Sequence, residues 1–304
     1  MKFITKIFSI ICVLQIFSSQ FLPKYNGLEK NEEVHWAVLV AGSNSFWNYR
    51  HQSDVFHSYQ TLIKRGLSPN NIIVLAYDDI ANSSDNPFKG KVFNRPDPLG
   101  EGEDVYKNIK IDYKGEDVNA ENFINIITGN KKGIKGGNGR VLESSSSDNV
   151  FIYFSDHGAV GLVAFPDTEL YADQLNNALE EMHKNNMYNK LVFYLEACES
   201  GSMFENILKK DIKVYATTAA KPDESSWATY CDPDDRVNGK SIGSCLGDEY
   251  SVNWIENAET QSNKQETLSQ QFTVIKKETT HSAAQQYGDF SYLNEINIPY
   301  KYIQ

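Results

Sequence analysis

Five short apolar segments decide which folds are open to this chain. None of them alternates apolar and polar residues, which is typical of strands buried on both faces of a sheet. The sequence between them has helical spacing; Val55, Tyr59 and Leu62, for example, share one side of a helix. This alternation of strand and helix predicts a three-layer α/β domain with a mostly parallel sheet. The five segments are Trp36–Ala41, Ile72–Tyr77, Val150–Phe154, Leu191–Leu195 and Val214–Thr217.

Other stretches complete the predicted order of elements. Asn119 is a suitable N-cap for a helix that ends at Gly129. Residues 175–182 and 266–286 have helical spacing, and Ser251–Glu256 is predicted to be a further strand. The tail from Ser282 to Gln304 has weak periodicity and is expected to be poorly ordered.

The N-terminus has the pattern of a secretory signal peptide. Lys2 and Lys6 precede the apolar stretch Ile7–Phe17, and small and polar residues follow up to Gln20. Such a stretch is too short to span a bilayer, which takes roughly 20 residues. Residues 1–20 are therefore predicted to be a signal peptide, with a buried strand as the alternative. The mature protein is expected to follow the secretory pathway without a membrane anchor.

The formal net charge of -11 limits the partners of the chain. Nucleic acids and anionic membranes bind clustered basic faces. The basic run Lys131–Lys135 lies among glycines and has the character of a solvated loop. A nucleic-acid partner is therefore not expected.

The four cysteines divide by position. Cys12 lies in the predicted signal peptide, while Cys231 and Cys245 bracket a loop rich in turn-forming residues and could pair as a disulfide. Cys198 is then left unpaired. An unpaired cysteine in a secreted protein is either an intermolecular link or a reactive thiol.

Polar residues gather where the predicted strands end. Asn48 follows the first strand, His157 the third and Cys198 the fourth, and parallel strands deliver such residues to one edge of the sheet. A histidine near a thiol can take its proton and so produce a nucleophile. The backbone N–H groups of Gly158 and Cys198 could then form an oxyanion hole.

Each of these residues alone is common outside active sites. A lone cysteine at a strand end is usually a small buried apolar residue, and a lone histidine is usually a loop residue with a hydrogen-bond partner. Their combination at neighbouring strand ends favours the catalytic interpretation. Cys198, His157 and the nearby carboxylates lack the local ligand-pair spacing of metal sites, so no metal or other cofactor is expected.

A pocket of mixed charge is predicted near the cysteine. If Arg50, Glu196 and Asp248 meet, the pocket is nearly balanced in charge and offers donors to a carbonyl oxygen and acceptors to an NH2 group. Those are the two ends of a carboxamide, which indicates selection of asparagine. The alternative is a surface ion-pair cluster.

The chain resembles the legumain family, the asparaginyl endopeptidases of lysosomes and plant vacuoles. The resemblance runs from about residue 35 to 290 and rests on strings such as WAVLVAGSN, NYRHQSD, VFIYFSDHG, FYLEACESGSM and LGDEYSVNW. It implies a caspase-like fold with a central, mainly parallel six-stranded sheet, in a peptidase domain over residues 30–290. Residues 291–304 would be a tail, and the helical prodomain of the family is expected to be absent.

The resemblance also implies roles for single residues. Cys198 would be the nucleophile, His157 the general base, Asn48 the group that orients it, and Gly158 an oxyanion donor. Asp156 matches an aspartate that can form a succinimide, and the loop closed by Cys231 and Cys245 is similar to one linked to peptide ligation in plant members. Asn82 opens a glycosylation sequon. The asparagine-selecting pocket would comprise Arg50, His51, Glu196, Ser225, Ser226 and Asp248.

The function implied is a cysteine endopeptidase that cuts after asparagine through a thioester. Aspartate would be accepted at acid pH, and ligase activity is possible in the family. The expected partners are peptide substrates and cystatin-type inhibitors, the expected state is a monomer, and the expected location is a lysosome, a vacuole or the extracellular space. Two alternatives remain open: a peptide transamidase or ligase, and a non-catalytic module that keeps the fold.

Overall fold

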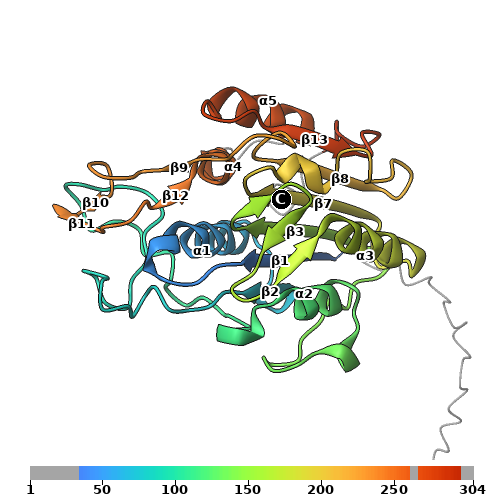
Figure 1. Ribbon diagram of the computed structural model, residues 1–304, viewed down its shortest axis with the longest axis horizontal. Coiled ribbons are helices and arrows are strands. Elements are labelled where there is room, and N and C mark those ends of the chain that lie inside the picture. The colour runs from blue at the N-terminus through green and yellow to red at the C-terminus, as the bar shows by residue number, and fades with distance from the viewer. Residues whose placement is uncertain (1–33, 261–265, 296–304) are drawn as a thin grey trace, which may run out of the picture. The chain divides into compact units, whose positions relative to one another are not determined.

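A six-stranded sheet forms the centre of the computed structural model, which describes residues 34–260 and 266–295 (Figure 1). The strand order is β13-β8-β7-β3-β1-β2. Neighbouring strands are parallel, except that β13 runs antiparallel to β8. The predicted signal peptide lies outside the described residues. The strands are β1 His35–Ala41, β2 Ile72–Leu75, β3 Asn149–Ser155, β7 Lys190–Glu196, β8 Val214–Thr218 and β13 Gln285–Gly288.

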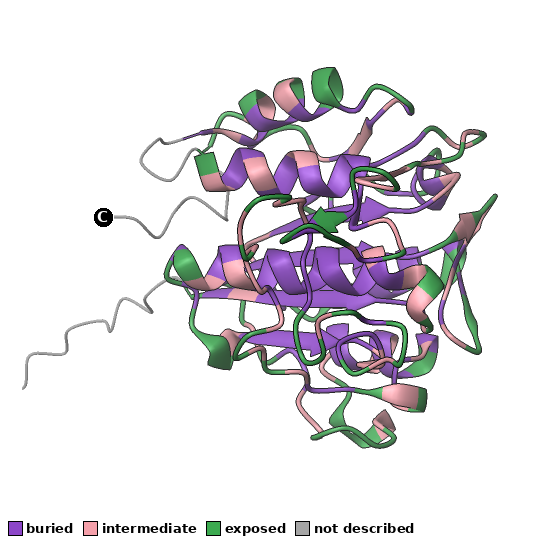
Figure 2. Cartoon of the chain, turned by 90° about the vertical axis from the view of Figure 1, so that its left-hand side faces the viewer, coloured by how far each residue is buried: buried purple, intermediate pink, exposed green. Residues whose placement is uncertain are grey.

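Both faces of the sheet are buried, as the unbroken apolar segments predict. In β1, Ala37 and Leu39 point into one hydrophobic core, and Val38 and Val40 point into the other. All four side chains are fully buried, because successive side chains of a strand point to opposite faces. The buried central strands and the inward-facing sides of the helices are visible in Figure 2.

Helices cover the sheet on both sides and complete the three layers. The first core contains residues of α1 (Tyr49–Lys64), α4 (Glu249–Thr260) and α5 (Leu268–Glu278). The second contains residues of α2 (Ala120–Ile127) and α3 (Ala172–Lys184). The three-layer architecture with a mainly parallel sheet is therefore confirmed. No helix among the described residues is long and apolar enough to cross a membrane.

The predicted start of α2 is correct. The Asn119 side chain accepts a hydrogen bond from the backbone N–H of Asn122 at 2.8 Å, which is the N-cap interaction expected from its position. The helix ends at Ile127, and Gly129 follows with a positive φ of 68°, a conformation that favours glycine.

Ser251–Glu256 was predicted as a strand, and this prediction is wrong. The segment lies inside α4, whose Tyr250 and Trp254 are one helical turn apart and both buried against the sheet. The Trp254 ring packs edge-on against Phe151 and Tyr153. Six residues are too few to separate a period of 2 from a period of 3.6, so tertiary packing decides the conformation.

The C-terminal part also differs from the expectation. The helix predicted over 266–286 ends at Glu278, and the polar segment Gln285–Gly288 pairs with β8 as the sixth strand. Tyr292 is buried and donates a hydrogen bond to the backbone oxygen of Leu191 at 2.9 Å. The tail is thus ordered as far as Glu295, and the rest of it lies outside the described residues.

Short elements decorate the ends of the central strands. β4, β5 and β6 form a small antiparallel sheet directly after β3, and β9 pairs with β12 beside α1. Their bounds are β4 Gly158–Ala159, β5 Leu162–Ala164, β6 Glu169–Tyr171, β9 Ala228–Thr229, β10 Arg236–Val237, β11 Lys240–Ser241, β12 Gly247–Asp248, η1 Phe46–Asn48, η2 Pro69–Asn71, η3 Gly115–Asp117, η4 Lys131–Gly133 and η5 Ser200–Met203.

The disulfide between Cys231 and Cys245 is present, which confirms that pairing. Its Cα atoms are 4.0 Å apart, and the two residues are separated by 14 positions in the sequence. Closing a loop of this length stabilises a fold by about 3 kcal/mol in the chain-entropy model.

Removing this disulfide is expected to lower the free energy of unfolding by about 3 kcal/mol. The comparison is between the wild type and the double variant Cys231→Ala and Cys245→Ala, by urea unfolding. A reducing agent should weaken the wild type and leave the double variant unchanged. Equal unfolding midpoints of the two proteins without reductant would contradict the prediction.

Candidate active site

The register of β3 and β7 places His157 and Cys198 side by side in the backbone. The two strands pair through seven residue pairs that end with Ser155 opposite Glu196. The backbone N–H of Asp156 continues the ladder by donating to the backbone oxygen of Glu196 at 3.1 Å. His157 and Cys198 each lie two residues beyond the last pair, so neighbouring strands carry them to the same edge.

Gly158 packs directly on the backbone after β7. A Cβ atom at this position would overlap the carbonyl oxygen of Cys198 and would lie 3.0 Å from the Cβ of Ala197. Any larger residue would push the ends of β3 and β7 apart. Glycine therefore lets the backbone that follows His157 pack against the backbone of Cys198.

Asn48 fixes the tautomer of His157. The Asn48 amide donates to the backbone oxygen of Asn44 at 3.0 Å, so its Oδ1 is the atom that faces His157 Nε2 at 2.8 Å. Nε2 must then carry the proton and donate it to Asn48, which leaves the lone pair on Nδ1. Partial desolvation, together with the nearby Arg50 guanidinium, lowers the pKa of His157. The ring is thus a neutral base near pH 7.

Cys198 lies half-buried beside the loop after β8. Its Sγ is 3.8 Å from the Ser226 backbone oxygen and 4.0 Å from the Ser226 hydroxyl. The next residue, Glu199, has a left-handed backbone with φ of 50° and donates its N–H to the Glu224 oxygen at 2.8 Å. This bond joins the cysteine turn to the segment that carries Ser225, which is exposed.

A buried cluster of charged side chains of both signs lies between β7, β12 and α1. Arg50 Nε donates to Asp248 Oδ1 at 2.9 Å, and Glu196 Oε2 accepts from the N–H and the hydroxyl of Ser251 at 3.0 and 2.9 Å. Burial raises the pKa of both Glu196 and Asp248. Within the described residues, Glu196 Oε1 and Asp248 Oδ2 have no hydrogen-bond partner. The cluster thus has two acceptor atoms without a hydrogen-bond partner beside a guanidinium.

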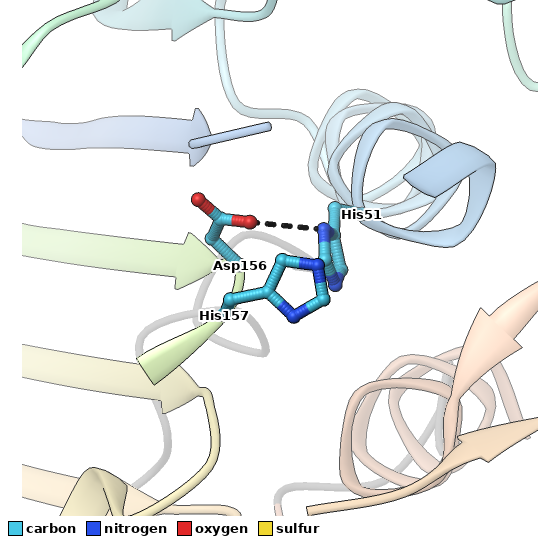
Figure 3. Close-up of side chains that lie close together, drawn as sticks. All are labelled: His51, Asp156 and His157. Carbon is cyan, nitrogen blue, oxygen red and sulfur yellow. Dashed lines mark ion pairs between the residues drawn. The ribbon is translucent and has the colours of Figure 1, made fainter. Parts of the chain in front are cut away.

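His51 lies between Asp248 of this cluster and Asp156 at the end of β3. Figure 3 shows its ring beside Asp156 and His157. Its Nδ1 is 3.1 Å from Asp156 Oδ1 and 2.7 Å from the Ser43 hydroxyl, and its Nε2 is 3.7 Å from Asp248 Oδ2. The ring meets His157 edge to face at 4.9 Å between centroids. Burial lowers the pKa of His51 and raises the pKa of Asp156 to about 8. Both are therefore neutral near pH 7.

The model of the peptidase C13 family matches residues 35–300. The chain belongs to the peptidase C13 family. It is 50% identical over 273 residues to the vacuolar-processing enzyme delta-isozyme of Arabidopsis thaliana, covering 87% of this chain and 58% of that protein. It is 49% identical over 258 residues to legumain of Mus musculus, covering 84% and 57%. The resemblance to legumains is confirmed.

Two further comparisons extend this picture of the C13 chain. It is 48% identical over 266 residues to the hemoglobinase of Schistosoma japonicum, covering 88% of this chain and 60% of that protein. It therefore spans less than two thirds of the length of these relatives. The structure of caspase-1 from Spodoptera frugiperda superposes with a TM-score of 0.51 at 11% identity, covering 93% of this chain and 96% of that one. The caspase-like fold is thus confirmed.

Within residues 34–260 and 266–295, two groups of side chains have the composition of a metal site. His51, Asp156 and His157 bring potential ligand atoms within 4.8 Å of one another. However, His51 Nδ1 faces Ser43 and Asp156, and His157 Nε2 faces Asn48, so these nitrogens already have partners.

The second group is His57, Glu103 and Glu259. Lys64 and Arg95 both form ion pairs with its two carboxylates, so the negative charge is already neutralised. This composition indicates a structural ion-pair cluster that joins α1 to α4 and to the loop that precedes Glu103.

Three residues of the C13 site were not predicted from sequence. Ser251 holds Glu196 and itself accepts a hydrogen bond from the Tyr153 hydroxyl at 2.6 Å. Ser43 holds His51. Asp54 lies four residues after Arg50 in α1, so the two side chains share one side of the helix. This spacing is the sequence signal that could have identified Asp54. Asn82 of the predicted sequon is exposed.

Proposed function

We propose that this C13 chain is a cysteine endopeptidase that hydrolyses peptide bonds after asparagine. One observation supports the proposal: the paired strands β3 and β7 lead to His157 and Cys198 at the same edge of the sheet, and His51 links His157 to the buried Arg50–Asp248 pair. The names of the relatives, a legumain and a vacuolar-processing enzyme, support it.

The reaction begins with proton transfer from the Cys198 thiol to His157 Nδ1, the nitrogen that the Asn48 contact leaves unprotonated. The thiolate attacks the carbonyl carbon of the substrate asparagine. The C–N bond then breaks, and the amine leaves with the proton from His157. Water, activated by the same imidazole, attacks the thioester and releases the acid and the thiol. An amine in place of water would give a ligated peptide.

The oxyanion of each tetrahedral intermediate needs donors at the strand edge. The backbone N–H groups of Gly158 and Cys198 are proposed for this role. The absence of a side chain at residue 158 lets the two backbone segments approach closely. Donors of this kind contribute a few kcal/mol in typical enzymes.

The pocket accounts for the choice of asparagine. Asp248 Oδ2 and Glu196 Oε1 are acceptors without partners in the described chain, and they suit the NH2 group of a carboxamide. The Arg50 guanidinium suits its carbonyl oxygen. An aspartate substrate would bind once carboxyl groups of the pocket or the substrate become protonated, which requires acid pH. Ser226 and His51 line the same region.

Acid compartments of the secretory pathway, such as a vacuole or lysosome, are the proposed location. The net charge, the relatives' names and the exposed sequon at Asn82 are consistent with this. The proposed partners are peptide substrates.

A scan of substrates that differ only in the residue before the cleaved bond tests the proposal. The wild type is expected to cleave an Ala-Ala-Asn reporter and to leave an Ala-Ala-Lys reporter intact. Asp248→Asn keeps the acceptor for Arg50 but replaces the free oxygen with a donor. Its kcat/KM for asparagine should fall about 10- to 100-fold, while its preference for aspartate should rise.

Labelling with iodoacetamide serves as the control, because an intact site in Asp248→Asn should still be alkylated at Cys198. If the wild type is alkylated there but cleaves the lysine reporter as well as the asparagine one, the proposed specificity is wrong. If nothing is cleaved after asparagine, the proposed function is wrong.

A further inference from the structure

We infer that Asp54 is a positioning residue that carries a proton in a buried carboxyl pair with Asp248 and thereby sets the pH range in which the pocket binds asparagine. This inference rests on the proposed function, because it concerns how the same pocket keeps its acceptor ionised.

Asp54 is fully buried, and its carboxyl accepts a hydrogen bond from the backbone of β12. Its Oδ1 accepts from the Asn94 amide at 2.6 Å, and the backbone N–H of Asp248 lies 3.2 Å from its Oδ2. A Cβ atom at Gly247 would lie 2.9 Å from Asp54 Oδ1, so the strand backbone packs directly on this carboxyl. The position of Asp248 thus depends on Asp54.

The two carboxyl groups belong to a buried cluster in which three carboxyls face a single guanidinium, that of Arg50; the carboxyls are those of Asp54, Glu196 and Asp248. One positive charge balances one buried carboxylate, so a second carboxyl beside it is favoured in its protonated form. Arg50 contacts Asp248 directly at 2.9 Å, whereas the contacts of Asp54 are an amide and a backbone N–H. The arginine therefore keeps Asp248 ionised, and the proton resides on Asp54.

Other charged and titratable groups face this pair from the surrounding elements. Glu196 is buried beside the pair, and its charge raises the pKa of Asp54. Burial also raises the pKa of Asp54. Arg50 is the positive charge that acts on both members of the pair. The titratable groups that face the pair are Arg50 and His51 on α1, Tyr153 on β3, His157 after β3 and Glu196 on β7.

Loss of the Asp54 proton would change the pocket. With the proton present on Asp54, Asp248 and Arg50 balance in charge. Without it, two adjacent buried carboxylates repel each other. β12 would then shift and the acceptor for the substrate NH2 would move. We therefore expect KM for asparagine substrates to rise with pH.

Asp54→Asn is the direct test, because the amide has nearly the shape of a protonated carboxyl and cannot ionise. The measurement is the pH dependence of kcat and KM with the Ala-Ala-Asn reporter. In the wild type, KM should rise with a limiting slope of about tenfold per pH unit, as for loss of a single proton. In Asp54→Asn, KM should stay within about threefold over the same range, with kcat at acid pH retained.

Asp148→Asn is the matched control. Asp148 is also buried and also accepts backbone N–H bonds, from Val34 and Ser145, but it lies at the opposite end of β3. This variant should keep the wild-type KM profile even if its stability falls. A merely structural role of Asp54 would lower activity at every pH and would not flatten the profile.

Asn94→Ala provides a second variant if Asp54→Asn does not fold. It removes the amide that stabilises the ionised form of Asp54, so the rise in KM should move to higher pH. A wild-type profile in a folded Asp54→Asn or Asn94→Ala protein would overturn the inference, while cleavage after asparagine would leave the proposed function standing. Absence of that cleavage in the wild type would instead overturn the proposed function.

Discussion

Replacing Cys198 with alanine is expected to lower kcat/KM for the Ala-Ala-Asn reporter by about four to six orders of magnitude. The thiol forms the bond to the substrate in the proposed reaction, and no other cysteine among the described residues is free. Water would have to attack the amide directly in the variant, with only the oxyanion donors and the pocket to help. Single-turnover assays with concentrated enzyme give the sensitivity that so large a decrease requires.

The pocket should survive this substitution. Cys198→Ala is expected to bind an asparagine-containing peptide with wild-type affinity, because the Arg50–Asp248 pair and Glu196 are untouched. Among the described residues, iodoacetamide should label the wild type at Cys198 and should label no cysteine of the variant, since Cys231 and Cys245 are paired. Full activity in an unlabelled Cys198→Ala protein would remove the thioester from the proposed mechanism.

The fold is expected to be most stable in acid and to weaken steeply towards pH 8. A carboxyl whose pKa is raised by folding holds its proton only in the folded chain above its ordinary pKa. Each such group therefore lowers the free energy of unfolding by about 1.4 kcal/mol for every pH unit between its two pKa values. Burial raises the pKa of Asp54, Asp156, Glu196 and Asp248.

The opposing groups act mainly at lower pH. Burial lowers the pKa of His51 and His157, so below about pH 6.5 the unfolded chain binds protons that the folded imidazoles do not. The pKa of Glu259 is lowered to about 2 despite its burial, through its contact with His57, and its contribution is lost only below about pH 4.3. We therefore expect maximal stability near pH 5 and the steepest loss between about pH 6.5 and 8.

Asp156→Asn isolates one of these groups. The pKa of Asp156 is about 8 in the folded chain and about 4 in the unfolded chain. Its contribution to the free energy of unfolding is therefore lost between about pH 4 and 8. The variant should lose about 1.4 kcal/mol less per pH unit than the wild type over that window. Urea unfolding at pH 5 and pH 7.5 measures the difference. Parallel pH profiles of the two proteins would show that this carboxyl is not protonated in the fold.

The central sheet could be predicted because its strands are buried on both faces. Residues such as Val38 and Leu39 are adjacent and both buried, and a short apolar run of this kind is typical of an inner strand of a parallel sheet. The edge strand β13 has the sequence QQYG and carries no such signal. Its pairing with β8 depends on backbone hydrogen bonds, which the identity of the side chains does not reveal.

The site could be predicted only in part, for a similar reason. His157 and Cys198 follow strands, and the rule for parallel sheets brings their positions together. The contact between Asp54 and Asp248 joins residues 194 positions apart, through the packing of a helix against a two-residue strand. No periodicity or motif in one sequence reports such a contact. The role of Ser251 was also missed, because Ser251–Glu256 was predicted to be a strand and lies in α4.

The seven paired residues of β3 and β7 have a practical consequence for protein engineering. Positions 157 and 198 lie two residues beyond the paired ends of the two innermost strands. A register slip of one residue would turn every buried side chain of a strand to the wrong core. Their spacing should therefore tolerate changes in the side chains themselves. Other pairs of reactive residues could therefore replace His157 and Cys198 without a change in the surrounding backbone.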